Sequence, residues 1–226
     1  MTIKNNGRTA GQKNQRIRSA RSVKKRMIGN ASYTLVTITG KTTMPKEKPL
    51  MQKEKLLKAV AFVKALNPLL YITYRFTCEK MSFHKCAMRH VLNWISGNPP
   101  NMVINYSKIL VASGNRFNTD RAAAKPVGDT ILFKWENDLI PKDYATDKAV
   151  LVAYCEALNK CIFTTMGPPR TARKAQLPVA EFRGRAVHTW LSFITADGKQ
   201  VADSIYTGKL IIGKYRLRST AKQKDL

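Results

Sequence analysis

The chain has 226 residues, 44% of them hydrophobic, which is enough for one large domain or two small ones with a buried core. Its 40 Lys and Arg residues outnumber its 14 Asp and Glu, giving a formal net charge of +26. This charge indicates a polyanionic partner, because a polyanion relieves the self-repulsion of such a chain. Four cysteines are too few for a disulfide scaffold, and no apolar run approaches the roughly 18 residues of a membrane span.

The positive charge is concentrated at the two ends of the chain. Residues 1–46 hold 11 Lys and Arg and no acidic residue, and residues 209–226 hold six Lys and Arg against one Asp. One explanation is a solvated tail that maintains solubility. A tail with that purpose alone has no need to exclude acids from 46 positions. We therefore interpret residues 1–46 as a basic arm that binds nucleic acid.

Residues 1–27 carry few large apolar side chains, so we expect them to be disordered in the free protein. Basic residues between 16 and 26 come close to helical spacing, which predicts a helix that forms on a partner. The β-branched segment Ser32–Thr39 predicts a strand. The residues that we expect to contact nucleic-acid phosphates are Lys4, Arg8, Lys13, Arg16, Arg18, Arg21, Lys24, Lys25 and Arg26.

Residues 47–100 are predicted to form a helical part. The first helix is expected over Leu50–Leu66, with Leu56, Leu57, Val60 and Val63 on its buried stripe, and Pro68 is expected to end it. Leu69–Phe76 is ambiguous between helix and strand. A second helix is predicted over Met81–Ser96, with Gly97 as its C-terminal glycine.

Residues 101–217 change in character to short strands, and residues 218–226 are read as a basic tail. Strands are predicted at Val103–Tyr106, Ile109–Ala112, Thr130–Trp135, Lys148–Cys155, Cys161–Thr165, Ala186–Ile194, Val201–Tyr206 and Lys209–Tyr215. The predicted fold is α+β: a basic extended arm, a small helical part and an immunoglobulin-like antiparallel β-sandwich.

The register of the Ala186–Ile194 strand has two possible settings, because neighbouring residues point to opposite faces. We expect Leu191 and Phe193 to face the sandwich core, together with Phe133 and Trp135 of the earlier strand. Trp190 then lies on the outer face, beneath the helical part or a partner subunit. We expect its loss to cost the isolated protein less than the loss of Phe193.

Two segments resemble ligand sites. Gly40-Lys41-Thr42 matches the end of a phosphate-binding loop, but Leu35 stands where that loop needs glycine and Pro45 blocks the helix that should follow. Cys78, His84, Cys86 and His90 lie close enough for zinc, but they lack the paired short spacing of a zinc finger. We interpret the cysteines as small core residues.

The remaining chemistry-bearing residues favour structural roles. Cys155 and Cys161 flank a short turn and are expected to be small core residues in a reducing compartment rather than a bridge. The acidic stretch Glu136, Asp138, Asp143 and Asp147 reads as a solvated loop rather than a metal site. His188 has no nucleophile motif near it. We therefore predict no catalytic residue, no metal and no cofactor, and a protein that is not an enzyme.

Six segments follow one another in the second half of the chain: Asn105–Gly114 (NYSKILVASG), Ala145–Tyr154 (ATDKAVLVAY), Phe182–Gly184, Val187–Phe193, Ala196–Val201 and Ser204–Gly208. They resemble, in the same order, segments of an uncharacterised family abundant in Bacteroidota. The resemblance covers about residues 50–213 and implies a helical N-terminal part followed by a β-sandwich. It implies no catalytic residue. The family usually opens with a glycine-rich segment, whereas this chain opens with Lys and Arg.

These observations predict a non-enzymatic cationic assembly protein that binds nucleic acid, such as a capsid or tail component of a phage. Its expected partners are the phosphate backbone and protein subunits of a larger assembly, with no membrane and no small-molecule substrate. The expected location is the cytoplasm, or the virion for a phage protein. The alternatives are a free cytoplasmic, non-sequence-specific nucleic-acid-binding protein and, more remotely, a nucleic-acid-processing enzyme.

Overall fold

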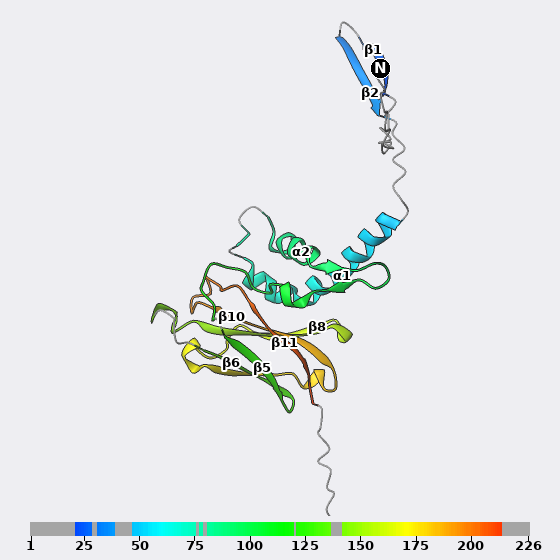
Figure 1. The fold of residues 1–226 in the computed structure, drawn as a ribbon. Helices are drawn as coiled ribbons and strands as arrows, with labels where there is room; N and C mark the ends of the chain where they lie inside the picture. The colour runs from blue at the N-terminus through cyan, green and yellow to red at the C-terminus, as the bar shows by residue number, and fades with distance from the viewer. Residues whose placement is uncertain are drawn as a thin grey trace, which may run out of the picture. The chain divides into compact units, whose positions relative to one another are not determined.

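The computed structural model describes residues 21–28, 31–38, 47–75, 77–78, 81–119, 121–136 and 142–213. The chain divides into two compact units, residues 1–46 and 47–226. The first unit holds two antiparallel strands, β1 (Arg21–Ile28) and β2 (Ala31–Ile38), which pair from Arg21↔Ile38 to Ile28↔Ala31 (Figure 1). The expected disorder of residues 1–27 in the free protein stays a prediction, and residues 1–20 lie outside the described residues.

The second unit begins with two helices and a short hairpin. Helix α1 (Glu47–Thr73) is followed by α2 (Phe83–Asn93), whose N-cap is Ser82. Strands β3 (Ile95–Ser96) and β4 (Val103–Ile104) then pair with each other, and a 3₁₀ turn, η1 (Tyr106–Lys108), leads into the sandwich. Gly97 follows β3 rather than the helix, so its predicted role as a helix C-terminal glycine is wrong.

Seven antiparallel strands in two sheets make up the rest of the unit. They are β5 (Ala122–Val127), β6 (Thr130–Trp135), β7 (Lys148–Cys155), β8 (Lys160–Thr164), β9 (Lys174–Pro178), β10 (Ala186–Ile194) and β11 (Ile205–Ile211). One sheet has the order β5-β6-β9 and the other β11-β10-β7-β8. In immunoglobulin lettering these are strands A-B-E and G-F-C-C′. The fold is thus α+β with a β-sandwich-like C-terminal region.

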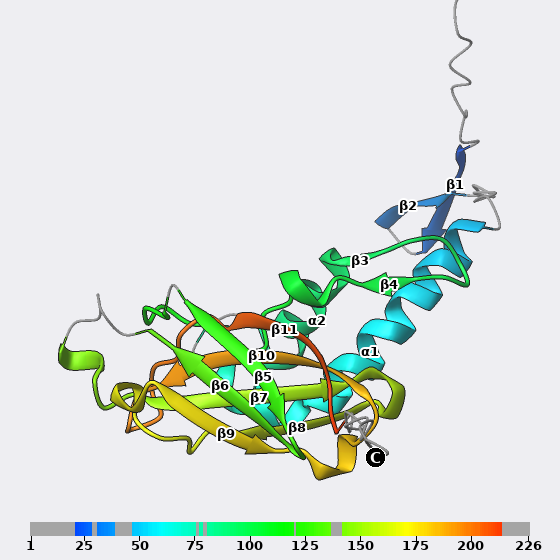
Figure 2. The same ribbon diagram turned by 60° about the horizontal axis from the view of Figure 1, so that its bottom comes forward.

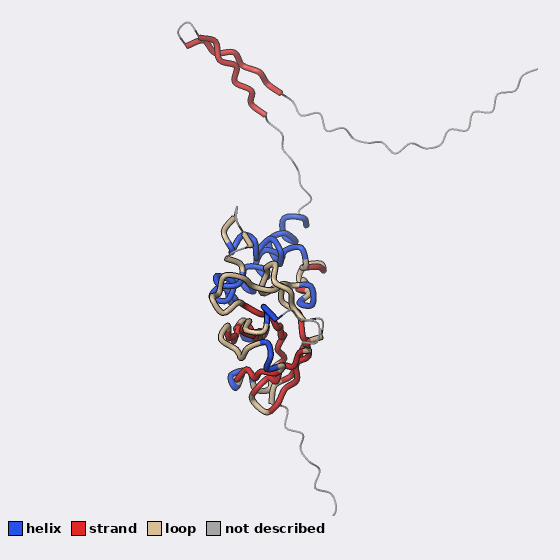
Figure 3. The backbone as a smooth tube through the Cα atoms, turned by 90° about the vertical axis from the view of Figure 1, so that its left-hand side faces the viewer, coloured by secondary structure: helices blue, strands red, loops and turns tan. Residues whose placement is uncertain are grey.

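The second unit has three layers. The helices cover one face of the four-stranded sheet, and the three-stranded sheet covers the other, as Figures 1 and 3 show. Consequently β7 and β10 are buried on both faces, and eight consecutive residues of β10, Val187–Ile194, are buried. Two separate apolar clusters result, one on each side of this sheet.

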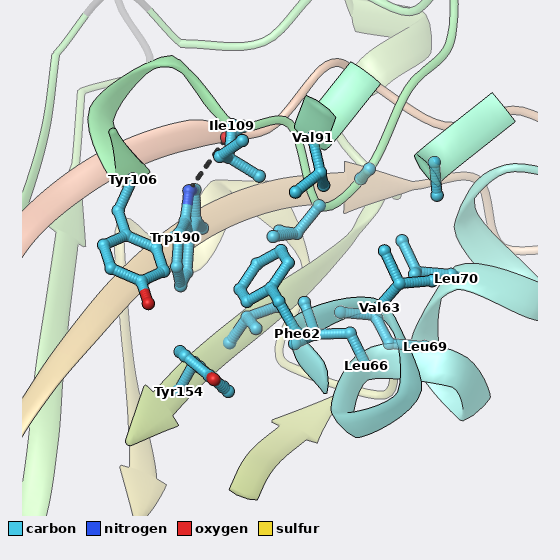
Figure 4. Packing of buried hydrophobic residues seen from close by; sticks show 14 of the residues in the cluster. Phe62, Val63, Leu66, Leu69, Leu70, Val91, Tyr106, Ile109, Tyr154 and Trp190 are labelled. Carbon is cyan, nitrogen blue, oxygen red and sulfur yellow. Dashed lines mark hydrogen bonds between the residues drawn. The ribbon is translucent and has the colours of Figure 1, made fainter. Parts of the chain in front are cut away.

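The cluster on the helical side centres on Trp190 of β10 and Phe62 of α1 (Figure 4). Trp190 is 0% exposed, and its indole N–H donates to the backbone oxygen of Ile109 at 3.0 Å. Leu191 and Phe193 belong to the other cluster, where Phe193 meets Trp135 edge-on with ring centroids 5.5 Å apart. The predicted register of this strand is therefore confirmed, with Trp190 beneath the helical part.

Helix α1 differs from its prediction in length and orientation. Pro68 lies inside the helix, so the prediction that it ends there is wrong. An internal proline costs about 3 kcal/mol, but burying one leucine contributes about 1.5–3 kcal/mol. Leu66, Leu69 and Leu70 are all at most 2% exposed, so their burial offsets that cost.

The predicted buried stripe of α1 is mostly on the solvent side. Leu56, Leu57 and Val60 are 40–58% exposed, whereas the helix buries Ala59, Phe62, Val63, Leu66, Leu69 and Leu70. The helix is apolar on nearly all sides, so its sequence pattern could not select the buried face. Leu50–Thr73 is also long and apolar enough to cross a membrane by length and composition alone, contrary to the expectation from the sequence. A core helix of a soluble protein meets the same criterion.

Two of the seven sandwich strands were not predicted. Strands β5 (AAAKPV) and β9 (KAQLP) are rich in alanine, lysine and proline, which are depleted in strands. Both lie at sheet edges. Proline has no N–H to donate to a neighbouring strand, and an edge strand tolerates this at Pro126 and Pro178. In addition, Ile109–Ala112 forms no strand. The strands predicted at Val201–Tyr206 and Lys209–Tyr215 are instead the single strand β11, preceded by an isolated bridge at Val201.

The two aromatic anchors of β10 should be comparably important for stability. Phe193→Ala and Trp190→Ala should each lower the free energy of unfolding by about 3–5 kcal/mol, because both side chains are 0% exposed. Denaturant unfolding measures the loss. Phe117→Ala is a matched control, since Phe117 is 44% exposed and should lose no more than about 1 kcal/mol. An unchanged midpoint for Phe193→Ala would contradict the observed packing.

Candidate nucleic-acid interface

The nine predicted phosphate-binding residues fall in the first unit. Lys4, Arg8, Lys13, Arg16 and Arg18 lie outside the described residues. Arg21, Lys24, Lys25 and Arg26 lie on β1 in the free chain, and the helix expected on a partner stays a prediction. Their backbone is extended and paired with β2, where Lys24 lies opposite Leu35 and Arg26 opposite Tyr33.

The second unit carries a basic cleft that the sequence analysis did not predict. It has a volume of about 630 Å³ and lies at one end of the three-stranded sheet, which faces the viewer in Figure 2. Its basic lining residues are Arg121, Lys134, Arg173 and Lys174. Lys134 and Lys174 lie directly opposite each other on β6 and β9. The sequence did not predict that Lys134 and Lys174 lie opposite each other, because β9 was not predicted as a strand.

Among the residues of the second unit that the structure describes, most acidic side chains form ion pairs or hydrogen bonds with their neighbours. Surface ion pairs join Asp129 to Arg183, Glu136 to Arg121, Glu181 to Lys160 and Asp197 to Lys199. The hydrogen bonds from Arg183 lower the pKa of the Asp129 carboxyl. Asp203 accepts the backbone N–H of Gly114 at 2.9 Å. These contacts leave a positive excess on the surface of the unit.

Asp147 is buried, so the interpretation of its segment as a solvated loop is wrong at this residue. Its carboxylate accepts hydrogen bonds from Arg116 at 2.8 Å and from Arg170 at 3.3 Å. The side chains of Asp147 and Arg170 are 2% and 0% exposed. The Arg170 guanidinium also lies 3.8 Å from the centroid of the Phe193 ring. Desolvation lowers the pKa of Arg170, while the charge of Asp147 opposes this effect.

This ion pair connects the end of one loop to the sandwich core, so we assign it a structural role. Arg170 donates to the backbone oxygen of Phe117 at 2.9 Å, and the Trp135 indole N–H donates to the backbone oxygen of Arg170 at 2.7 Å. Of the other acidic residues in the predicted loop, Glu136 and Asp143 are exposed, and Asp138 lies outside the described residues.

The candidate zinc ligands have other partners. Cys78 and Cys86 form a disulfide, which corrects the expectation that they are independent core thiols. His84 is exposed, and His90 accepts the backbone N–H of Leu110 at 2.9 Å. Cys155 and Cys161 are both free thiols. Among the residues that the structure describes, no three His, Cys, Asp or Glu side chains come together as metal ligands. Gly40-Lys41-Thr42 lies outside that part of the chain.

His188 lies in a group of aromatic side chains on the helical side of β10. Its ring stacks on Tyr106 with centroids 3.9 Å apart, and its Nδ1 lies 2.9 Å from the Tyr206 hydroxyl oxygen. Burial, aided by the charge of Lys209, lowers the pKa of His188 to about 4. The imidazole is therefore neutral at pH 7, and its contacts are those of a packed side chain.

A family of unknown function, DUF6266, matches residues 30–208. The chain belongs to this family. No curated protein matches the chain. Because the family has no known function, membership assigns no activity, and the function has to be inferred from this chain's own residues.

The segments that carry the family resemblance hold the layers together. In Asn105–Gly114, Ile109 accepts the Trp190 indole hydrogen bond and the Val111 N–H donates to the Ser204 hydroxyl at 2.8 Å. A Cβ at Gly114 would lie 2.0 Å from the backbone oxygen of Val201, so only glycine fits this close approach. These segments therefore stabilise the fold of this family member.

The buried pair should be far more important for stability than a surface pair. Asp147→Ala should cost about 3–5 kcal/mol, because it leaves the Arg170 guanidinium buried without a counter-charge. Glu136→Ala is the control: its partner Arg121 is 78% exposed, and the loss should stay below about 1 kcal/mol. Denaturant unfolding of both variants and of Asp147→Ala/Arg170→Met tests this. Equal losses in the two single variants would contradict the assignment.

His188 should make stability depend on pH. Because its folded pKa lies below the usual 6.5, the unfolded chain binds the proton more readily, and stability falls as the pH drops from 6.5 towards 4. The loss is on the order of 3 kcal/mol. His188→Gln should flatten the melting temperature over this range, whereas His84→Gln, on the exposed surface, should not. Identical pH profiles for wild type and His188→Gln would refute this role.

Proposed function

We propose that the protein is a non-enzymatic cationic protein that binds nucleic acid through the phosphate backbone. The observation that carries the proposal is the acid-free segment of residues 1–46 with 11 Lys and Arg, in a chain of net charge +26. Each phosphate that is neutralised by Lys or Arg releases condensed counterions, which drives binding without reading the sequence. The positive excess on the second unit supports the same partner.

The proposal extends to a role as a subunit of a nucleoprotein assembly, such as a phage capsid or tail. Its support is the solvent side of α1, where Leu50, Leu57 and Tyr71 are 56–58% exposed. Exposed apolar side chains on one helix favour contact with another protein surface. A free cytoplasmic nucleic-acid-binding protein is the alternative. Light scattering of the purified protein with and without nucleic acid separates particles or oligomers from a monomer.

The arm should account for most of the salt dependence of binding. If about 6 phosphates are neutralised, affinity should fall by roughly 10³ between 50 and 200 mM salt. A full-length variant with Gln at the nine predicted phosphate-binding positions should lose most of this slope. Fluorescence anisotropy with a labelled duplex measures both quantities.

The matched control is a full-length chain in which the order of residues 1–27 is scrambled. It keeps the charge and should keep the affinity, because phosphate contacts depend on charge rather than on residue order. An unchanged affinity and salt slope in the Gln variant would refute the proposed function of the arm.

A further inference from the structure

The outer face of the β5-β6-β9 sheet is strongly basic. Along β6, Ile131, Phe133 and Trp135 are buried against the other sheet, so Lys134 projects from the opposite face. The same alternation places Lys125 of β5 and Lys174 of β9 on this outer face. All three lysines are exposed. The face is therefore an open surface with three cationic side chains.

Two of these lysines repel each other in the free protein. Lys134 and Lys174 are paired in the register of β6 and β9. The Cβ atoms of directly opposed residues lie about 4.5–5.5 Å apart, and like charges at such positions are destabilising. Within the described part of the chain no ion pair involves Lys125, Lys134 or Lys174, and the nearby Glu136 is paired with Arg121. A bound anion would relieve this repulsion.

The shape of this face suits an extended anion. Ala123 of β5 lies opposite Lys134, so a small side chain stands on one side of this lysine and Lys174 on the other. Ala122 and Ala123 also line the 630 Å³ cleft, together with Arg121, Glu136 and Arg173. Lys134 and Lys174, which form no ion pair among the described residues, are the cations of this lining that favour a phosphate chain.

We propose that this outer face, with Lys134 and Lys174 at its centre, is a second contact for the phosphate backbone of the bound nucleic acid. The proposal rests on the proposed function, because it adds a structured surface to the contacts of the arm. Neutralising two phosphates contributes a salt slope of about 1.8. The arm can meet phosphates in any order, whereas this face presents its charges at fixed spacing.

The test uses the full chain and a labelled duplex, with Lys134→Gln/Lys174→Gln as the variant. Its salt slope should fall by about 1.8 relative to wild type, so its affinity deficit should shrink by roughly tenfold between 50 and 200 mM salt. The matched control is Lys85→Gln/Lys108→Gln, which removes the same charge from exposed positions on α2 and η1. Its slope should change by less than about 0.5.

A further variant separates binding from folding. Lys174→Glu places an opposite charge beside Lys134, so the melting temperature should not fall, while affinity should drop at least as much as in the double Gln variant. Equal slopes for the sheet variant and its control, or full competition by polyglutamate, would overturn the surface and leave the arm in place. A wild-type chain that binds no duplex would overturn the proposed function itself.

Discussion

The burial of β7 and β10 on both faces is the constraint on which the rest of the second unit depends. Antiparallel sheets commonly leave one face to water, but here the helices cover one side and the second sheet the other. Successive residues, such as Trp190 and Leu191, therefore belong to different cores. A slip by one residue would exchange the two sets, so the register is fixed from both sides. Helices and sandwich are in consequence one packed unit.

Two titratable side chains in the interior are engaged by their neighbours. His188 is neutral at pH 7 and packed against Tyr106, and Asp147 is engaged by Arg116 and Arg170. Four of the other described carboxylates are paired with neighbouring cations at the surface. Because the chain has 40 basic and 14 acidic residues, such pairs cannot neutralise it. The residual charge is the feature on which the proposed function rests.

The sequence predicted what depends on strong local patterns and missed what depends on tertiary context. The alternation of Ile131, Phe133 and Trp135 and the register of β10 were correct, because β-branched and aromatic residues mark half-buried strands. The edge strands β5 and β9 were missed because alanine, lysine and proline are tolerated there only through pairing with β6. The buried face of α1 and the burial of Asp147 depend on partners distant in sequence. The basic cleft was missed with β9, since Lys134 and Lys174 become neighbours only through that strand.

The arm and the second unit belong to one chain, and this covalent link changes how strong each contact has to be. Once one of them holds a nucleic acid, the other meets it at an effective concentration set by the connection, which is in the millimolar range for short flexible linkers. A surface with only three lysines can then contribute although it would bind weakly alone. In the proposed function both contacts meet phosphates rather than base edges, so their combination raises affinity without conferring sequence preference. Such a combination suits the proposed binding of nucleic acid of any sequence.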